Sequence, residues 1–358
     1  MELLSVTMND GVMPRTEIEG KDNSSEDKSN YKVVCKGDMV YNSMRMWQGA
    51  NGVSNYDGIV SPAYTVLMPT EEIDNQYFAA LFKTSNLINE FRKNSQGLTS
   101  DTWNLKYPQI RPIRLCIPSL QEQNKISSFI GTLEERISKQ RQLVDSLKKY
   151  KRGVMQKVFR NMSAFSPSGF ETVRLSDIFK KASRRNSNGE IKNVITNSAE
   201  HGLIPQRDFF DKDIAVDGNT GNYYVIEYGD FVYNPRKSNT APYGPFNRYE
   251  RQEKGIISPL YTCLVLKTDI EPAYLAWYFK SDAWYRYIYD NGSQGVRHDR
   301  VSMTDDLLMG IPVIIPSKDS QIKIAKLLDC LEKRFQVELS QCEYLKTVRE
   351  ALLQQLFI

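Results

Sequence analysis

The chain has 358 residues, of which 41% are hydrophobic and 25% charged, and a formal net charge of +4. This composition is typical of a globular protein with more than one domain. No apolar run is long enough for a membrane-spanning helix, and the first residues lack the features of a signal peptide, so a cytoplasmic location is expected. The five cysteines form no CxxC pair and the two histidines lie far apart, which argues against zinc, His-rich metal sites and a disulfide framework.

The sequence repeats itself, with an offset that grows from 192 to 198 residues along the chain. The offset changes only between matched blocks, as it does when insertions fall in loops. Solenoid repeats are much shorter than this, so the pattern predicts a duplicated domain. The matched blocks are KGDMVYN (36–42) with YGDFVYN (228–234), GIVSPAYT (58–65) with GIISPLYT (255–262), YFAALFK (77–83) with YLAWYFK (274–280), and IPS (117–119) with IPS (315–317).

The first part of each copy mixes β-rich runs with one amphipathic helix. The segments 230–233 and 260–266 are the clearest strands of the second copy. In the first copy the helix is expected to begin near Asp74, an N-cap residue type, and in the second copy Pro272 occupies the first turn. We therefore predict an α+β globule in each copy. The core side chains expected on the first helix are Tyr77, Leu81, Leu87, Ile88 and Phe91.

The second part of each copy is a long helix whose apolar residues recur at spacings of four and three. Such a heptad pattern, beginning after Pro118 and again after Pro316, predicts a coiled-coil seam. Because both helices begin just after their own globule, antiparallel pairing is expected to separate the globules; two separate amphipathic helices are the alternative. The seam positions are Ile126, Ile130, Leu133, Ile137, Gln140, Val144, Leu147, Lys151, Val154 and Val158, and 198 residues later Ile324, Leu328, Leu331, Phe335, Glu338, Cys342, Leu345, Arg349, Leu352 and Leu356.

The pattern divides the chain into five parts. At an offset of 191, Met1 aligns with Lys192, so the first copy lacks roughly twenty residues with which the second begins. The first globule is therefore expected to be incomplete at its N-terminus. The predicted parts are a first globule (1–117), a first long helix (118–160), a linker (161–171), a second globule (172–315) and a second long helix (316–358).

A search for catalytic motifs finds none. The chain has no GxxxxGK[ST] phosphate loop, no GxGxxG that opens a βαβ unit and no GxSxG nucleophile elbow. The segment 233–236 faintly resembles the Asn-Pro-Pro-aromatic loop of amino-methyltransferases, but its second proline and aromatic residue are missing. We therefore expect no catalytic residues, no cofactor and no bound metal.

Polar loops offer side chains suited to base edges and phosphates. Arg and Lys can form paired hydrogen bonds with guanine, and Asn and Gln with adenine. Ordinary surface loops are the alternative, but these loops differ between the two copies while the core blocks recur, which favours two different targets. The segment 119–160 adds ten Lys and Arg against four Asp and Glu, a charge that faces phosphates, an acidic partner or simply solvent. The candidate DNA-binding residues are Arg45, Trp47, Gln48, Asn51, Gln96, Arg236, Lys237, Asn239, Tyr243, Arg248, Arg297 and His298.

The segment IPSLQEQNKI (117–126), with its continuation to QKVF (156–159), resembles the central spacer of type I restriction–modification specificity subunits. Residues 315–357 resemble their distal spacer, although KDSQ (318–321) departs from LQEQ (120–123). The resemblance covers essentially the whole chain. It implies two target-recognition domains that each read half of a split site in double-stranded DNA. It also implies antiparallel helices that set the gap between the halves and dock methyltransferase subunits and restriction/translocase subunits, with no catalysis by the chain itself.

Two other classes of function stay open at this point. A coiled-coil adaptor with protein-binding globules would show no salt-sensitive DNA binding. An enzyme with a degenerate site, such as a methyltransferase fragment, would bind a cofactor as the isolated chain.

Overall fold

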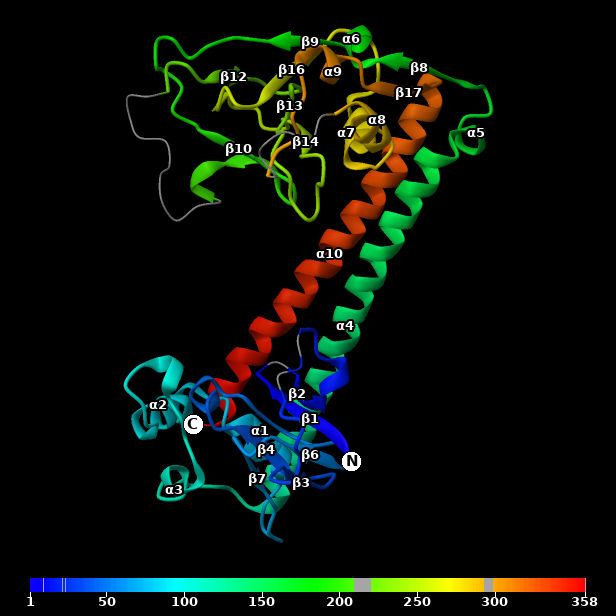
Figure 1. Ribbon diagram of the computed structural model, residues 1–358. Helices are drawn as coiled ribbons and strands as arrows, with labels where there is room; N and C mark the ends of the chain where they lie inside the picture. The colour runs from blue at the N-terminus through cyan, green and yellow to red at the C-terminus, as the bar shows by residue number, and fades with distance from the viewer. Residues whose placement is uncertain (9, 21, 23, 209–219, 293–298, 358) are drawn as a thin grey trace. The chain divides into compact units, whose positions relative to one another are not determined.

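The computed structural model describes residues 1–8, 10–20, 22, 24–208, 220–292 and 299–357, and the chain divides into two compact units (Figure 1). Unit 1 comprises Met1–Val144 with Val337–Ile358, and unit 2 comprises Asp145–Gln336. Two long helices, α4 (Leu120–Arg160) and α10 (Lys318–Leu356), contribute residues to both units.

Unit 1 contains two small sheets and a set of short helices. The sheets have the strand orders β2-β1-β6-β3 and β5-β4-β7, and the β1–β6 pair is parallel. Aromatic and aliphatic side chains from the helices fill a core against β4. The elements are β1 (Glu2–Thr7), β2 (Gly11–Pro14), β3 (Lys32–Val34), β4 (Met39–Asn42), β5 (Asn51–Val53), β6 (Gly58–Val60), β7 (Tyr64–Leu67), α1 (Asn75–Leu81), α2 (Ser85–Asn94), α3 (Tyr107–Ile110), and the 3-10 turns η1 (Arg15–Glu17), η2 (Met46–Gln48) and η3 (Ser100–Thr102).

Unit 2 has the same kind of elements in the same order, with additional strands. A four-stranded sheet runs β14-β13-β16-β9, and β10-β11, β12-β15 and β17-β8 form pairs. Its elements are α5 (Met162–Phe165), β8 (Phe170–Arg174), α6 (Leu175–Ile178), β9 (Phe179–Ala182), β10 (Ile195–Ser198), β11 (Gly202–Pro205), η4 (Gln206–Asp208), β12 (Tyr224–Ile226), β13 (Phe231–Tyr233), β14 (Phe246–Arg248), β15 (Gly255–Ile257), β16 (Thr262–Leu266), α7 (Pro272–Lys280), α8 (Tyr285–Asn291), α9 (Asp305–Met309) and β17 (Pro312–Pro316).

The repeated Gly-Asp pair makes the same turn in both units. Asp38 accepts a hydrogen bond at Oδ2 from the backbone N–H of Cys35 (2.8 Å), and Asp230 accepts one from the N–H of Glu227 (2.9 Å). The preceding Gly37 and Gly229 have positive φ angles of 98° and 91°, a conformation that favours glycine. The turn leads directly into β4 or β13, which explains why this block recurs.

The predicted helix of the first globule is two helices. Asp74 is the N-cap of α1, as expected, and its Oδ1 accepts hydrogen bonds from the N–H groups of Gln76 and Tyr77. The helix ends at Leu81, and Thr84, in an extended conformation, is the N-cap of α2. Leu87 and Phe91 are buried on α2 rather than on α1. A single helix was therefore wrong, because the Thr84-Ser85 pair starts a new helix.

The two long helices pair in an antiparallel coiled coil, as predicted. In unit 1, Arg349 contacts Glu134 (3.2 Å), while Ile130 and Leu353 share an apolar cluster. In unit 2, Lys151 contacts Glu332. In unit 1 the contacts of Ile130, Glu134 and Gln140 on α4 are with Leu353, Arg349 and Glu338 on α10, so residue numbers rise along one helix as they fall along the other. All predicted seam residues are buried or half-buried, so two unpaired helices are not observed.

Candidate nucleic-acid interface

In unit 2, two loops far apart in sequence are joined by backbone hydrogen bonds. We call residues 234–244 and 299–301 the unit 2 loop pair. Val301 N–H donates to the carbonyl of Pro235 (2.9 Å), and Lys237 N–H donates to the carbonyl of Asp299 (2.9 Å). Arg236 and Arg300 face each other in an antiparallel bridge. The first loop contains several of the predicted DNA-binding residues, whereas Asp299 and Arg300 of the second loop were not predicted.

The loop pair presents two guanidinium groups around one carboxylate. The Nε atoms of Arg236 and Arg300 lie 3.9 and 3.7 Å from Asp299 Oδ2. The side chain of Arg236 is 66% exposed, and Asn239 is also exposed. Exposed ion pairs of this kind contribute little to stability, so these arginines remain available for a ligand. Arg300 could have been suspected only from its place beside the candidate residues Arg297 and His298.

The side chains of Tyr243 and Arg248 pack against other residues of unit 2 and are less available to a ligand than Arg236 is. The Tyr243 ring packs on Tyr285 (centroids 4.9 Å apart), and its carbonyl accepts a hydrogen bond from the Tyr233 hydroxyl (2.8 Å). The side chain of Arg248 is only 13% exposed and lies over the ring of Tyr228. The candidates Arg297 and His298 lie outside the described residues.

Unit 1 brings together the corresponding two loops. We call residues 43–50 and 94–105 the unit 1 loop pair. Leu105 N–H donates to the carbonyl of Ser43 (2.8 Å), as Val301 does to Pro235. Trp47 and Trp103 pack edge to face with centroids 5.2 Å apart, and Arg92 lies over the Trp47 ring. The same arrangement therefore carries different side chains in the two units.

The structure separates the unit 1 candidates into exposed and buried groups. Arg45 and Gln96 are exposed, and Trp47 and Gln48 are half-buried. Asn51 is fully buried in β5, where its Nδ2 donates to the carbonyl of Gly49 (3.1 Å). Its assignment as a DNA-contacting residue is therefore corrected, because in this structure its amide faces the protein interior.

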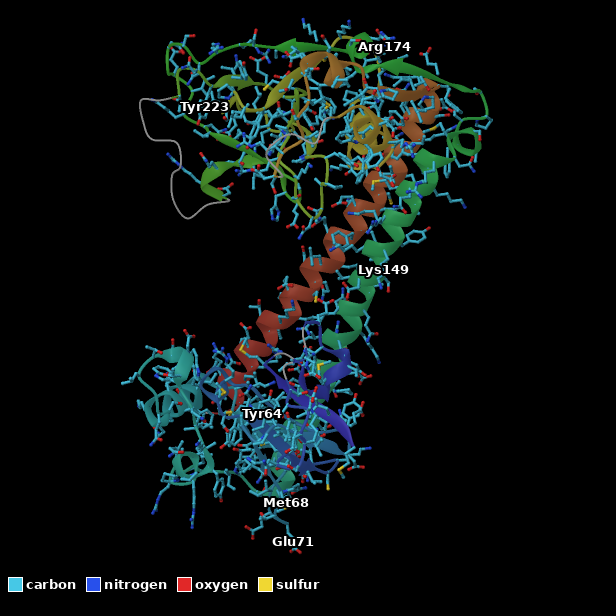
Figure 2. All side chains as sticks on the ribbon, viewed as in Figure 1. Tyr64, Met68, Glu71, Lys149, Arg174 and Tyr223 are labelled. Carbon is cyan, nitrogen blue, oxygen red and sulfur yellow. The ribbon has the colours of Figure 1, made fainter. Side chains whose placement is uncertain are left out.

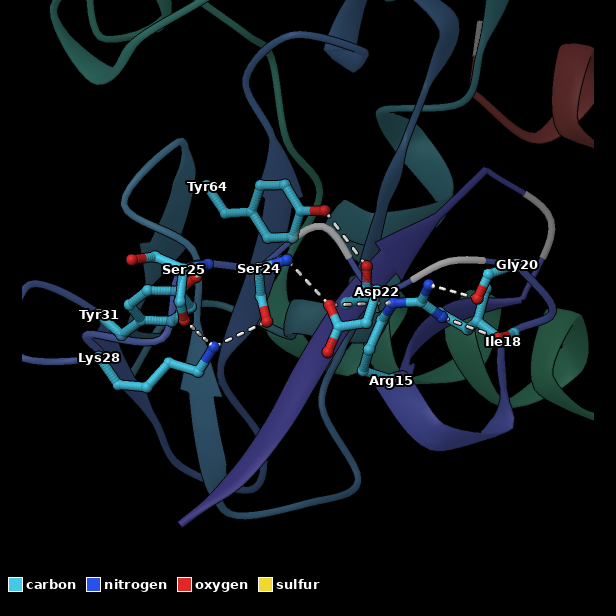
Figure 3. Close-up of polar contacts among 10 residues, drawn as sticks. Arg15, Ile18, Gly20, Asp22, Ser24, Ser25, Lys28, Tyr31 and Tyr64 are labelled. Carbon is cyan, nitrogen blue, oxygen red and sulfur yellow. Dashed lines mark hydrogen bonds and ion pairs between the residues drawn. The ribbon is translucent and has the colours of Figure 1, made fainter.

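In unit 1, described side chains between β2 and β3 form hydrogen bonds with one another and with the nearby backbone (Figure 3). Arg15 donates to the carbonyls of Ile18 (2.7 Å) and Gly20 (3.0 Å), and Lys28 donates to Ser24 Oγ (2.7 Å). The backbone N–H of Ser24 bonds Asp22 and holds the pKa of that carboxyl below its usual value. The charged groups of Arg15 and Lys28 therefore already have hydrogen-bond acceptors within this segment.

A groove of about 1,090 Å³ lies within unit 2, between the globule and its part of the helix pair. Six Lys and Arg side chains line it, together with four carboxylates. In the described part of the chain, Lys148 and Arg152 are exposed and have no carboxylate within ion-pair distance. The basic excess of 119–160 indicated this region, although not which residues line a groove. The basic lining residues are Lys148, Lys151, Arg152, Arg248, Arg251 and Lys280.

Two further observations concern the described residues only. They contain no group of three or more His, Cys, Asp or Glu side chains placed to hold a metal ion. None of their helices has the length and apolar character needed to cross a membrane.

Comparison with known proteins identifies relatives of the chain. Residues 5–149 match the family described as the type I restriction modification DNA specificity domain. The type I restriction enzyme HindI specificity subunit of Haemophilus influenzae is 26% identical over 152 residues, which cover 41% of this chain and 32% of that protein. The match therefore spans about a third of that relative's length.

Solved structures show the same fold along most of the chain. A structure described as the basis of complex assembly and conformational transition of the type I R-M system has a TM-score of 0.58 at 18% identity, covering 93% of this chain and 84% of that one. The S subunit of a type I restriction-modification system from M. genitalium has a TM-score of 0.55 at 14% identity, covering 99% and 94%.

Proposed function

We propose that the chain is a specificity subunit of a type I restriction–modification system, because residues 5–149 match the DNA specificity domain of that family and a specificity subunit is similar to part of the chain. We further propose that it reads a two-part target in double-stranded DNA. Each unit reads one half of the site through its loop pair. The residues 1–117 and 172–315 are the two recognition domains in this proposal, and the helix segments 118–160 and 316–358 set the gap between the half-sites.

The observation that carries the proposal is the duplicated loop pair with divergent side chains. In unit 2, Arg236 and Arg300 project from adjacent extended segments beside Lys237. Two neighbouring guanidinium groups suit the O6 and N7 atoms of guanine in the major groove. The unit 1 loop pair instead offers Arg45, Gln48 and Gln96, of which the amides suit adenine. One framework with two sets of side chains fits two different half-sites.

The groove and the helix pair supply contacts that do not depend on base sequence. Lys148 and Arg152 suit phosphate oxygens, and each phosphate neutralised makes binding more sensitive to salt. Lys149 lies on the exposed face of α4 (Figure 2) and suits either DNA or an acidic protein surface. We propose that exposed faces of α4 and α10 dock the methyltransferase and the restriction/translocase subunits, which supply the chemistry.

The experiment that tests the function is co-expression and co-purification with type I methyltransferase subunits from the same source, followed by mapping of methylated bases genome-wide. Methylation at a two-part site with a fixed gap is the expected result. A stable complex that methylates no defined site would contradict the reading of DNA by this chain. If the chain binds no DNA at any salt concentration and forms no complex with the methyltransferase subunits, the coiled-coil adaptor is favoured.

A second experiment tests the spacing role of the helices. Insertion of one or two helical turns at matched positions in α4 and α10 preserves the seam and lengthens each helix by about 5–10 Å. The methylated half-sites are expected to move apart by roughly the corresponding number of base pairs, each about 3.4 Å. An unchanged gap would refute the spacing role while leaving DNA recognition intact.

A further inference from the structure

The first loops of the two loop pairs begin with the same turn but carry different exposed side chains. At an offset of 192 residues, Met44 in unit 1 corresponds to Arg236 in unit 2. The N–H of Met44 donates to Oδ1 of Asn42 (3.0 Å), as the N–H of Arg236 donates to Oδ1 of Asn234 (2.9 Å). The same backbone geometry therefore presents a thioether in one unit and a guanidinium group in the other.

The second loops differ in the same direction. The N–H of Leu105 is bonded to the first loop of unit 1 as the N–H of Val301 is to that of unit 2, which places Trp103 at the position of Asp299. In unit 2 the carboxylate of Asp299 lies close to two guanidinium groups. In unit 1 an indole ring takes its place, so this part of the loop pair changes from charged to apolar.

The aromatic pair of unit 1 supports the backbone at Met44. Trp103 packs edge to face on Trp47 with centroids 5.2 Å apart, and Trp47 Nε1 donates to the carbonyl of Met44 (3.1 Å). The two rings are half-buried, whereas Met44 is 45% exposed. A held backbone with an exposed apolar side chain is suited to an apolar contact with a ligand.

We infer that Met44 is a specificity-determining residue of unit 1 that contacts the C5-methyl group of a thymine in the major groove. Thymine is the base that presents a methyl group there, and apolar side chains read it by direct contact. A methionine side chain is unbranched and flexible, so it adapts to the position of that methyl group.

This inference rests on the proposed function, because it assigns a base contact to the unit 1 loop pair. It makes an A·T pair part of the half-site that unit 1 reads. The amides of Gln48 and Gln96 in the same loop pair suit the adenine of such a pair. In unit 2 the guanidinium group of Arg236 at the corresponding position suits guanine instead.

Replacement of thymine by uracil tests the contact, because it removes the methyl group and keeps the hydrogen-bonding groups of the base. In duplexes that carry the mapped two-part site, each thymidine is replaced singly by deoxyuridine. Binding to the full chain, purified with the methyltransferase subunits, is measured by fluorescence anisotropy. At one or more positions within one half-site, wild type is expected to bind about fourfold more weakly, as the loss of one buried methyl group predicts.

Three variants assign this loss to a side chain. Met44→Ala is expected to weaken binding to the unmodified site and to abolish the effect of uracil at the same positions, since the two changes remove one contact. Met44→Leu, which keeps an apolar side chain of similar size, is expected to retain most of the preference for thymine. Met68→Ala is the control: Met68 is 80% exposed and follows β7 at the end opposite Tyr64, which pairs with Asn42 beside the loop (Figure 2). It is expected to behave as wild type.

Loss of the thymine preference in Met44→Ala, with retention in Met44→Leu and Met68→Ala, supports the inference. Tolerance of uracil at every position would overturn it, as would an equal effect of uracil on wild type and Met44→Ala. In both of these cases a defined two-part site would still uphold the proposed function. The finding that the complex recognises no defined site would overturn the proposed function, and the thymine contact with it.

Discussion

The side chain of Gln140 on α4 is hydrogen-bonded to Glu338 on α10, which is its own counterpart in the repeat at an offset of 198 residues. The Nε2 atom donates to the backbone carbonyl of Glu338 (2.9 Å) and to its Oε2 (2.7 Å). In an antiparallel pair of repeated helices, a residue meets its counterpart only at the centre of the pairing. A polar pair in a mainly apolar seam favours one register over others, at some loss of stability.

This pair leads to a prediction about the register of the coiled coil. Gln140→Leu alone is expected to destabilise the chain by about 1 kcal/mol, because both hydrogen bonds from Gln140 Nε2 to Glu338 are lost while Glu338 stays half-buried. The double variant Gln140→Leu, Glu338→Leu is expected to recover that loss or exceed wild type, because both positions become apolar. Chemical unfolding of the three proteins measures both effects. A double variant less stable than the single one would contradict the argument.

A second duplicated contact ties each long helix to its globule. Gln123 is 1% exposed; its Oε1 accepts from the N–H of Asp74 (3.0 Å), and its Nε2 donates to the carbonyl of Pro118 (3.0 Å). Gln321 does the same with Glu271 (2.8 Å) and Pro316 (2.8 Å). Asp74 and Glu271 are the N-caps of α1 and α7, so one buried amide joins two helix starts.

Gln123→Leu is expected to destabilise unit 1 by about 1–3 kcal/mol, because it leaves a buried backbone donor and acceptor without partners. Exposed Gln121 in the same turn provides the control, and Gln121→Leu is expected to change stability by less than about 0.5 kcal/mol. Thermal unfolding, with hydrogen exchange at 72–76, measures the effect. Equal effects of the two substitutions would show that the buried amide contributes nothing specific.

Local patterns in the sequence predicted the features that depend on neighbouring residues. The heptad spacing fixed the seam residues, including Gln140 and Glu338, because coiled-coil contacts repeat along one helix. Asp74 was identified as an N-cap because that preference is set by its own helix. The break at Thr84 was missed because the apolar spacing continues across it, although a Thr-Ser pair can start a helix.

The candidate site depended on contacts that no local pattern reports. Arg300 belongs beside Arg236 only because a backbone bridge joins loops more than sixty residues apart. Asn51 has the residue type of a base-contacting side chain, but its place opposite Tyr41 in β5 buries it. Composition and repeats therefore predicted where the loops lie, while the tertiary fold decides which side chains they expose.

The guanidinium and ammonium groups of the unit 2 loop pair provide a test of base reading. Arg236→Ala and Lys237→Ala are each expected to weaken binding to the cognate site by about 1–3 kcal/mol if they contact bases, with relaxed preference at one half-site. An equal loss on all sequences would identify phosphate contacts instead. Lys267→Ala is the control. Thr262, at the start of β16, pairs with Tyr233 beside the loop, whereas Lys267 follows the opposite end of that strand. Fluorescence anisotropy at fixed salt measures all three.

Gly244 is required for the shape of the unit 2 loop pair. Its φ angle is +83°, and a Cβ there would lie 2.0 Å from the carbonyl oxygen of Asn234. Gly244→Ala is therefore expected to displace the loop and destabilise the chain by about 2 kcal/mol or more, since strain and overlap add. Gly189 also has a positive φ (+65°) but open space around it, and Gly189→Ala is expected to cost about 1 kcal/mol. Similar losses of stability and DNA binding in both variants would contradict a special role for Gly244.

Lys83 provides a prediction about pH. Its ammonium lies in a hollow of about 750 Å³ in unit 1, with Glu134 and Asp10 favouring the charge and Arg349 opposing it. Burial is the largest effect and lowers the pKa of Lys83 below its usual value. The folded state therefore gives up this proton at a lower pH than the unfolded state. Lys83→Met is expected to raise the melting temperature at pH 7 by about 2–4 °C.

The advantage of Lys83→Met is expected to shrink as the pH rises from the lowered pKa of Lys83 towards 10.5. In that window the unfolded wild-type chain binds more protons than the folded one, so wild-type stability increases with pH. Lys280, the counterpart in unit 2, is exposed over the Trp277 ring, and Lys280→Met is expected to give no such gain. Thermal unfolding of the three proteins between pH 7 and 10.5 measures the difference. A gap between Lys83→Met and wild type that stays constant or widens with pH would show that the buried ammonium is not its cause.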